Sequence, residues 1–405
     1  MMVPRLRLSL FKDDKSSRWS LAHLGEIVEF KKGKGISKSD ISNNGTYPCV
    51  RYGELYTIYN EKIDKIQSKT NCNPNEHVVS KSGDILIPAS GETAVDIARA
   101  SAILRSDVIL GGDINILSPK SNSLNSLFLS YSIVGKKKME LAKMAQGNSV
   151  FHLYPNQLKT LEIWIPLIDE QTKIADFLST IDEKIKLLTQ QHYLLGQYRK
   201  GLIQNILSKE LRFKDENEKE FPEWNLVRLG NYLIRYNEKS TENNQYPVLT
   251  SSREGIYFQK DYFNGEDIAS KNNIGYNVVP KGYFTYRHMS DDLVFKFNIN
   301  TLCDKGIVST LYPVFTTKLN ALFLQLKLNE GNEFRDYAIQ QKQGGSRTYM
   351  YYSKLESLKL MIPNTAEQTK IANFISAFDD KIAAKKTELD KLKTWKQGLL
   401  QQMFV

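Results

Sequence analysis

Cysteine and histidine are scarce in this 405-residue sequence, which contains three cysteines and five histidines. Three separated thiols make neither a disulfide framework nor a metal-ligand pattern, and no histidine spacing resembles a zinc site. The sequence also lacks a long uninterrupted apolar run, which argues against a membrane-spanning helix or a signal peptide. We therefore expect a protein of the reducing cytoplasm that has no membrane partner and no metal of its own.

Motifs for catalysis are missing as well. The sequence has no phosphate-binding P-loop, no helicase signature and no Asn-Pro-Pro-aromatic motif of the kind used for amino-group methylation. The triplet Asp182-Glu183-Lys184 resembles a nuclease motif, but it lies in the middle of a helical pattern, where surface charges are expected. We expect no catalytic residue and no cofactor in this chain.

Positive charge is what the sequence has in excess, with 55 Lys and Arg against 45 Asp and Glu and a net charge of +10. Such an excess favours a polyanionic partner such as nucleic acid. It is concentrated in residues 1–168, whereas residues 210–362 are almost balanced. A nucleic-acid surface in the second half of the chain would therefore have to be built locally.

An internal repeat organises the chain. The words EQTKIA occur at 170–175 and again at 367–372, and the flanking segments align without a gap at a constant offset of 197. The preceding segments QGNSVFHLYPNQLKTL (146–161) and QGGSRTYMYYSKLESL (343–358) align at the same offset. Weaker landmarks continue upstream: WSLAHLGEI with WNLVRLGNY, LNSLFL with LNALFL, SGDILIP (82–88) with KGYFTYR (281–287), and GDINILSP (112–119) with GIVSTLYP (306–313). A variable segment followed by a shared segment thus occurs twice.

A heptad pattern runs through both shared segments. Apolar residues recur seven apart and at interleaved positions, which predicts two helices of roughly 35–40 residues, about 55 Å long. The seam residues are Ile174, Leu178, Ile181, Ile185, Leu188, Leu195, Leu202 and Ile206 in the first copy, and Ile371, Ile375, Phe378, Ile382, Leu389, Leu392, Leu399 and Met403 in the second. We expect the two seams to pack together as an antiparallel pair; the alternative is that each packs on its own neighbouring domain. The polar seam residues His192, Arg199, Lys385 and Lys396 should loosen the pair or mark where another partner docks.

The variable segments combine short apolar or alternating runs, typical of strands, with fewer helical runs. Strands are expected in YPCVRYG, DILIPAS, GDINIL, YPVLTSS and GIVSTLYP, and helices over 124–144 and 319–340. We predict an α+β fold with pseudo-twofold symmetry, in which two domains alternate with two long antiparallel coiled-coil helices. The predicted boundaries are 1–165 and 210–362 for the domains, and 166–209 and 363–405 for the helices.

Basic and aromatic residues mix at several places in the variable segments, and glycines nearby allow close backbone approach. Arginine can read guanine edges through paired hydrogen bonds, and lysine can contact phosphate. The bland alternatives are a solvated loop for 31–39 and a hairpin with buried tyrosines for 344–354. The candidates for DNA binding are Lys32, Lys34, Arg51, Tyr52, Arg99, Asn148, His152, Arg253, Arg287, His288, Ser346, Arg347 and Tyr349.

Two variable domains alternating with two helices, each preceded by Ile-Pro and opening with EQTKIA, resemble the specificity subunit of type I restriction–modification systems. The resemblance covers nearly the full length. It implies that each domain recognises one half of a bipartite double-stranded DNA target and that the helices set the distance between the half-sites. It further implies two modification subunits that use S-adenosylmethionine to methylate adenine, and two restriction subunits that use ATP and Mg²⁺, with no cofactor in this chain.

The duplicated motif sits where such a scaffold could present the same surface to two copies of one partner. We therefore assign candidate docking roles to Gln171, Lys173, Gln368 and Lys370. Other readings stay open: a duplicated nucleic-acid-binding scaffold outside restriction–modification, a coiled-coil adaptor for proteins, or a stand-alone nuclease or methyltransferase.

Overall fold

The computed structural model describes residues 4–12, 18–263, 272–342 and 346–405. The glycines at 344 and 345, which belong to the predicted hairpin 344–354, lie outside the described residues. The chain forms two compact units. Unit 1 comprises Met1–Gln190 with Lys386–Val405, and unit 2 comprises Gln191–Lys385. Each unit thus contains one variable domain and half of each long helix.

Unit 1 is built on a five-stranded sheet in the order β2-β10-β6-β8-β4, beside a three-stranded sheet in the order β5-β3-β9. The central strand β6 is buried along its whole length, as the apolar sequence DILIP requires. The strands of the two sheets are β2 (Val28–Lys32), β3 (Tyr47–Val50), β4 (Lys62–Ile63), β5 (Ser68–Thr70), β6 (Asp84–Pro88), β8 (Ser101–Ile103), β9 (Ile109–Leu110) and β10 (Ile114–Pro119). Two further pairs join β1 (Ser20–His23) to β12 (Glu162–Ile165) and β7 (Ser90–Gly91) to β11 (Phe151–His152).

Short helices complete unit 1. They are α1 (Ser9–Lys12), α2 (Leu24–Ile27), α3 (Glu54–Thr57), α4 (Ala94–Ile97), α5 (Ser126–Gly135), α6 (Lys138–Met144) and α7 (Pro155–Leu158). Leu129 and Ile133 of α5 lie in the same buried cluster as Ile85 and Ile87 of β6. One face of the sheet is therefore closed by α5, which also reaches the long helices through Phe128.

Unit 2 repeats part of this plan around a four-stranded sheet in the order β14-β22-β18-β20. Its strands are β13 (Asn225–Arg228), β14 (Leu233–Tyr236), β15 (Leu249–Ser251), β16 (Ile256–Phe258), β17 (Asn277–Pro280), β18 (Phe284–Thr285), β19 (Met289–Ser290), β20 (Asn298–Ile299), β21 (Lys305–Val308), β22 (Val314–Thr317), β23 (Thr348–Tyr349) and β24 (Lys359–Ile362). Its helices are α9 (Gln259–Tyr262), α10 (Ala321–Glu330), α11 (Asn332–Gln340) and α12 (Tyr352–Ser357). The predicted α+β class is confirmed.

The strand order corrects one of the upstream landmarks. In unit 1, β10 lies between β2 and β6, and in unit 2, β22 lies between β14 and β18. The counterpart of β10 is therefore β22, whereas GIVSTLYP forms β21, which pairs with β17 instead. The alignment of GDINILSP with GIVSTLYP was wrong by one strand, because short apolar runs look alike whichever strand they form.

The two predicted domain helices each divide in two. Residues 124–144 form α5 and α6, with a break after Gly135, and residues 319–340 form α10 and α11, with a break at Gly331. Gly331 has extended backbone (φ −79°, ψ 137°), which ends α10. The starts of α5 and α10 match, because Asn125 and Asn320 cap them in the same way. Each asparagine side chain accepts a hydrogen bond from the backbone N–H three residues later.

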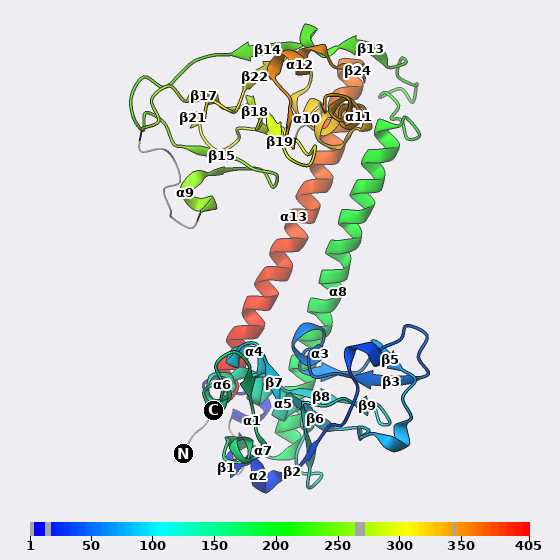
Figure 1. Ribbon diagram of the computed structural model, residues 1–405, viewed down its shortest axis with the longest axis vertical. Helices are drawn as coiled ribbons and strands as arrows, with labels where there is room; N and C mark the ends of the chain where they lie inside the picture. Colours follow the sequence, from blue (N-terminus) through cyan, green and yellow to red (C-terminus); the bar gives the residue numbers. More distant parts are fainter. Residues whose placement is uncertain (1–3, 13–17, 264–271, 343–345) are drawn as a thin grey trace. The chain divides into compact units, whose positions relative to one another are not determined.

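The long helices are α8 (Ile168–Leu207, 40 residues) and α13 (Thr365–Gln402, 38 residues). In unit 1 the beginning of α8 packs against the end of α13, and in unit 2 the end of α8 packs against the beginning of α13 (Figure 1). Ile174, Leu178 and Ile181 meet Leu399 and Met403 in a buried cluster. The predicted antiparallel pair is confirmed, and its seam also packs on each unit's own domain, so both predicted packings coexist.

Two of the four polar seam residues do not loosen the pair. Lys396 of α13 forms ion pairs with Asp182 of α8 and with Glu61. Arg199 of α8 forms an ion pair with Asp379 of α13. The expected loosening is not seen at these two residues, because each cation pairs with a carboxylate on the facing helix. A partner-docking role for the four residues stays a prediction.

Candidate nucleic-acid interface

The entry into each long helix is built by the duplicated Glu-Gln pair. The Glu170 carboxylate is fully buried and accepts from Arg7 Nε (2.7 Å) and NH2 (2.6 Å) and from Trp19 Nε1 (3.4 Å). In unit 2 the Glu367 carboxylate accepts from Arg212 Nε (3.3 Å) and NH2 (3.1 Å) and from Trp224 Nε1 (3.1 Å). Arginine neutralises each buried carboxylate, and the tryptophan that directly precedes the first strand of the domain is hydrogen-bonded to the helix that follows the domain.

Gln171 and Gln368 complete this entry from the interior. Gln171 Oε1 accepts from the Asn125 backbone N–H (2.8 Å), and its Nε2 donates to the carbonyls of Ser123 and Pro166 (2.9 Å each). Gln368 accepts from the Asn320 N–H (2.9 Å) and donates to the Pro363 carbonyl (2.9 Å). The docking role predicted for these glutamines needs correction, because both are buried and bonded within their own unit.

The two lysines of the motif remain docking candidates by position. Lys173 and Lys370 are exposed, and each lies two residues after the buried glutamine, on the same helical turn. Lys370 Nζ donates to the carbonyl of Lys214 (2.6 Å). The docking assignment for this pair stays a prediction.

Stacked aromatic rings lie just before each helix entry, at equivalent places in the repeat. In unit 1 the rings of His152 and Tyr154 stack at 6.0 Å with an interplanar angle of 20°. In unit 2 the rings of Tyr349 and Tyr351 stack at 5.6 Å and 12°. Both pairs begin on the second strand of a two-stranded ladder, β7 with β11 and β19 with β23.

Tyr154 and Tyr351 were missing from the predicted site. Each is 49% exposed, which is high for a large aromatic side chain. The signal was available in the sequence, since both tyrosines occupy the same repeat position two residues after His152 and Tyr349. In unit 2 the stack gains a third ring, because His288 lies over Tyr351 at 5.1 Å and 27°.

Unit 2 gathers most of its predicted DNA-binding residues around β19. Arg253 makes a two-bond ion pair with Asp292 (2.8 and 2.7 Å), and Arg347 Nε donates to Asp291 (2.9 Å). The Arg253 hydrogen bonds, with a further one from Ser290, lower the pKa of Asp292 to about 2. These ion pairs fix the orientation of both guanidinium groups, although each arginine side chain is more than half exposed.

A cavity of about 370 Å³ lies beside this cluster. Its lining includes Arg253 and Arg287 from the predicted set, together with Lys296 and Tyr312. His288 turns its ring nitrogen Nδ1 to the Leu311 carbonyl, which orients the ring for the stack. The structure thus brings together Arg253, Arg287, His288, Arg347 and Tyr349, and the exposed Ser346 adjoins Arg347 in sequence.

Unit 1 distributes its predicted residues more widely. Lys32, at the end of β2, is 3.8 Å from Asp113, and Asp113 accepts from Ser90 Oγ (3.2 Å) next to His152 on the paired strand. Lys34 is exposed in the loop that follows β2. Lys32, Ser90 and His152 form one neighbourhood.

The remaining unit 1 residues lie outside that neighbourhood or on its edge. Arg51 is held by Glu54 (3.0 Å), which turns its guanidinium back onto its own chain. Tyr52 is 37% exposed, and its ring centroid lies 6.3 Å from that of Tyr56. Arg99 Nε is buried and has no hydrogen-bond partner among the described residues. Asn148 is exposed in the loop before β11.

This arrangement suits binding of a polyanion better than a reaction. Exposed cations lie next to stacked rings in both units, a combination that can contact phosphate and the faces or edges of bases. Within the described residues, no cluster of three or more His, Cys, Asp or Glu side chains could hold a metal ion. In the part of the chain that the structure describes, no helix is both long and apolar enough to cross a membrane.

Comparison with known proteins identifies the family. A model of the type I restriction modification DNA specificity domain matches residues 16–195 and again residues 226–394. The chain belongs to this family. Each match includes one variable domain and most of the long helix that follows it. The domain that defines the family therefore corresponds to one copy of the repeat found in the sequence.

Individual relatives of this type I specificity chain match nearly its full length. The type I restriction enzyme MjaVIII specificity subunit of Methanocaldococcus jannaschii is 24% identical over 417 residues, covering 94% of this chain and 91% of that subunit. The crystal structure of a type I restriction–modification S subunit from M. genitalium has a TM-score of 0.60 at 15% identity, covering 100% of this chain and 99% of that one. A chain from a structure that addresses complex assembly and conformational transition of the type I R-M system has a TM-score of 0.53 at 16% identity, covering 95% and 96%. The structural likenesses establish a shared fold.

Proposed function

We propose that this chain is the DNA sequence-specificity subunit of a type I restriction–modification complex. Each variable domain reads one half of a bipartite double-stranded DNA target, and the α8–α13 pair sets the number of unspecified base pairs between the halves. The chain works in the cytoplasm, where the DNA lies, and supplies recognition without catalysis.

One observation carries this proposal. The family model matches the chain twice, and each matched half ends with the same construction: a stacked aromatic pair, then a buried Glu-Gln helix entry, then a long helix. The sequence EQTKIA of the entry is identical in the two halves, while the stacked pairs differ, with His152 in one and Tyr349 at the equivalent place in the other. A common scaffold with two different surfaces is what reading two different half-sites requires.

The recognition step follows from the chemistry of these surfaces. Lysines and arginines contact phosphates and give an affinity that falls with salt, while other side chains read base edges in the major groove. A good paired contact to a base contributes about 1–3 kcal/mol of discrimination. Because both domains belong to one chain, DNA that carries both half-sites at the right separation binds much more tightly than DNA with one.

Partner subunits supply the chemistry in this proposal. Two modification subunits dock on the two-fold-related helix entries, with exposed Lys173 and Lys370 as candidate contacts, and methylate adenine from S-adenosylmethionine after the base leaves the stack. Two restriction subunits use ATP and Mg²⁺ to cleave unmodified DNA. The type I R-M assembly whose chain shares this fold supports the existence of such a complex.

The experiment that tests the proposal maps methylated adenines in a host that carries this chain with its modification subunits. We expect one bipartite motif, lost when the chain is deleted. Replacing residues 210–362 with the corresponding segment of a relative should change one half of the motif and leave the other intact. A methylation pattern that ignores the chain would instead favour a scaffold or adaptor outside restriction–modification.

A second experiment tests the spacer role. The ion pairs Asp182–Lys396 and Arg199–Asp379 share one antiparallel register, in which the step 190/191 of α8 corresponds to the step 387/388 of α13. Inserting one heptad at both steps keeps both ion pairs and lengthens the pair by about 10 Å, or about three base pairs of DNA. The motif's gap should grow by that amount while both half-sites keep their bases. The insertions are placed in the middle of the helices because residues nearer the helix start, such as Ala175, are buried in the core of unit 1.

A further inference from the structure

The two interhelical ion pairs occupy equivalent positions in the repeat. Asp182 of α8 and Asp379 of α13 are 197 residues apart, and so are Arg199 of α8 and Lys396 of α13. Unit 1 therefore pairs Asp182 with Lys396, and unit 2 pairs Asp379 with Arg199. The same contact is made once in each unit, with the two helices exchanging roles.

The contact in unit 1 is mostly buried and has several partners. Lys396 Nζ lies 2.6 Å from Asp182 Oδ1 and 2.9 Å from Glu61 Oε2, and it sits 5.5 Å over the ring of Tyr131. The Tyr131 hydroxyl donates to Asp182 Oδ2 (2.6 Å). The side chains of Lys396 and Asp182 are 12% and 21% exposed. Burial outweighs the attraction of Lys396 and raises the pKa of Asp182.

A strand of the domain closes the rest of this contact. Lys62, on β4, donates to Ser179 Oγ (3.1 Å) and pairs with Glu183 (3.2 Å), both on α8. Glu61 directly precedes that strand and reaches Lys396 of α13. The domain of unit 1 thus holds both long helices through adjacent residues.

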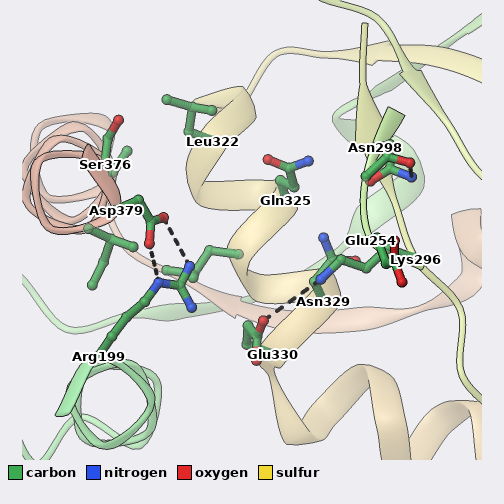
Figure 2. Close-up of a pocket in the computed structure, with 14 residues that line it drawn as sticks. Arg199, Glu254, Lys296, Asn298, Leu322, Gln325, Asn329, Glu330, Ser376 and Asp379 are labelled. Carbon is green, nitrogen blue, oxygen red and sulfur yellow. Dashed lines mark hydrogen bonds and ion pairs between the residues drawn. The ribbon is translucent and has the colours of Figure 1, made fainter. Parts of the chain in front are cut away.

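The contact in unit 2 faces a cavity of about 290 Å³ instead (Figure 2). The side chains of Arg199 and Asp379 are 26% and 46% exposed, roughly double the exposure of their counterparts. Figure 2 shows Arg199 and Asp379 at the left of this space, with Leu322 and Gln325 of α10 to their right. A second ion pair lines the same cavity, with Lys296 Nζ 3.9 Å from Glu330 Oε1.

The sequence explains why the cavity exists. LNSLFLSY of α5 aligns with LNALFLQL of α10, so the position of Tyr131 is taken by Leu326, which lines the cavity. Leucine is shorter than tyrosine and has no hydroxyl to offer Asp379. Ser376, the counterpart of Ser179, also lines the cavity, and no hydrogen bond from a lysine to it is found among the described residues.

We propose that this asymmetry makes the interhelical ion pair salt-sensitive in unit 2 only: salt weakens the Arg199–Asp379 contact, whereas the Lys396–Asp182 contact persists. Exposed ion pairs are screened by mobile ions, while buried pairs with additional hydrogen-bond partners are screened far less. In unit 2 the helices therefore open locally more often at high ionic strength, while the buried apolar cluster that they share with the domain keeps them together. This conclusion concerns the chain itself and does not depend on the proposed function.

Hydrogen–deuterium exchange of the full-length chain tests the proposal. Between about 50 mM and about 500 mM NaCl, we expect exchange in residues 191–207 and 365–385 to rise roughly threefold, with residues 168–190 and 386–402 unchanged. Asp379→Asn should produce the faster exchange already at low salt and remove its salt dependence. An equal salt response in both units, or none in either, would overturn the proposal.

A cavity-filling variant separates this explanation from simple loss of stability. Leu326→Tyr restores the tyrosine found in unit 1 and places a hydroxyl near Asp379, so it should reduce the salt response of unit 2. The reverse change, Tyr131→Leu, should give unit 1 a salt response it lacks. If Leu326→Tyr folds, as shown by an unchanged circular dichroism spectrum, and keeps the full wild-type salt response, the cavity is not the cause.

Discussion

Removing the Gln171 side chain should destabilise unit 1, because this buried amide joins the start of α8 to the loop 123–125 and to Pro166. Gln171→Ala deletes hydrogen bonds to the Asn125 N–H and to the carbonyls of Ser123 and Pro166. A buried N–H left without an acceptor costs about 1–3 kcal/mol, and a carbonyl with a second lone pair costs less. The loss of packing adds to this, so we expect a total of about 2–4 kcal/mol.

Two further variants sharpen the measurement. Gln171→Glu keeps the acceptor for Asn125 but turns a second oxygen toward two carbonyls, so it should cost at least as much as alanine. Lys173→Ala, at an exposed position two residues away, should change stability by less than about 0.5 kcal/mol. Gln368→Ala should give the corresponding loss in unit 2, and the two losses should add, since the sites share no partners.

The assay is urea denaturation followed by hydrogen exchange resolved by segment. The first gives the change in free energy of unfolding, and the second shows which unit loses protection. The reasoning is refuted if Gln171→Ala and Gln368→Ala leave stability unchanged within about 0.5 kcal/mol. If the same variants then fail to assemble with modification subunits, the original docking assignment would be correct after all.

Three further predictions concern single contacts. Arg347→Ala should weaken binding to the second half-site by about 1–3 kcal/mol without affecting the first, measured by titration of DNA with one half-site changed at a time; equal weakening on random DNA would make it a phosphate contact. Arg253→Ala should raise the pKa of Asp292 from about 2 toward its ordinary value, followed by NMR of the carboxyl carbon. Since that pKa is depressed in the folded chain, the stability from this pair is present at neutral pH and is lost as the pH falls toward 2, so the variant should show a weaker acid dependence. Tyr131→Phe should cost about 1–2 kcal/mol by removing the hydroxyl from buried Asp182, measured by denaturation; no loss would mean that solvent replaces the hydroxyl.

The predicted surface residues illustrate where reasoning from sequence reached its limit. Residue type and repeat position led to Arg253, His288, Arg347 and Tyr349, which the fold does bring near one another around β19. Arg51 satisfied the same criteria but is turned onto Glu54, only three residues away. All three arginines are paired with a carboxylate, but the Arg51 side chain is 27% exposed against 60% for Arg253 and 52% for Arg347. Residue type and repeat position do not give that exposure, because it depends on how the surrounding chain packs.

The docking assignment of the two glutamines needed correction for a related reason. A duplicated motif shows that a segment is constrained, but the constraint can come from inside the molecule. Gln171 and Gln368 are duplicated because each closes a helix start against an asparagine-capped domain helix, whose place in the chain lies more than forty residues upstream. Only the tertiary structure shows that both glutamines satisfy buried backbone groups within their own unit.

The sequence by itself determined the architecture of this protein. The offset of 197, the heptads and the alternation of variable with shared segments define two α+β domains and an antiparallel helix pair, because periodic apolar residues must be buried against one another. Only the tertiary structure showed how the surroundings of the interhelical ion pair differ between the two halves. Tyr131 and Leu326 are one aligned position in a repeat, yet one closes an ion pair and the other leaves a cavity. That difference depends on volume and on neighbours brought from elsewhere in the chain, such as Glu61, which no local pattern specifies.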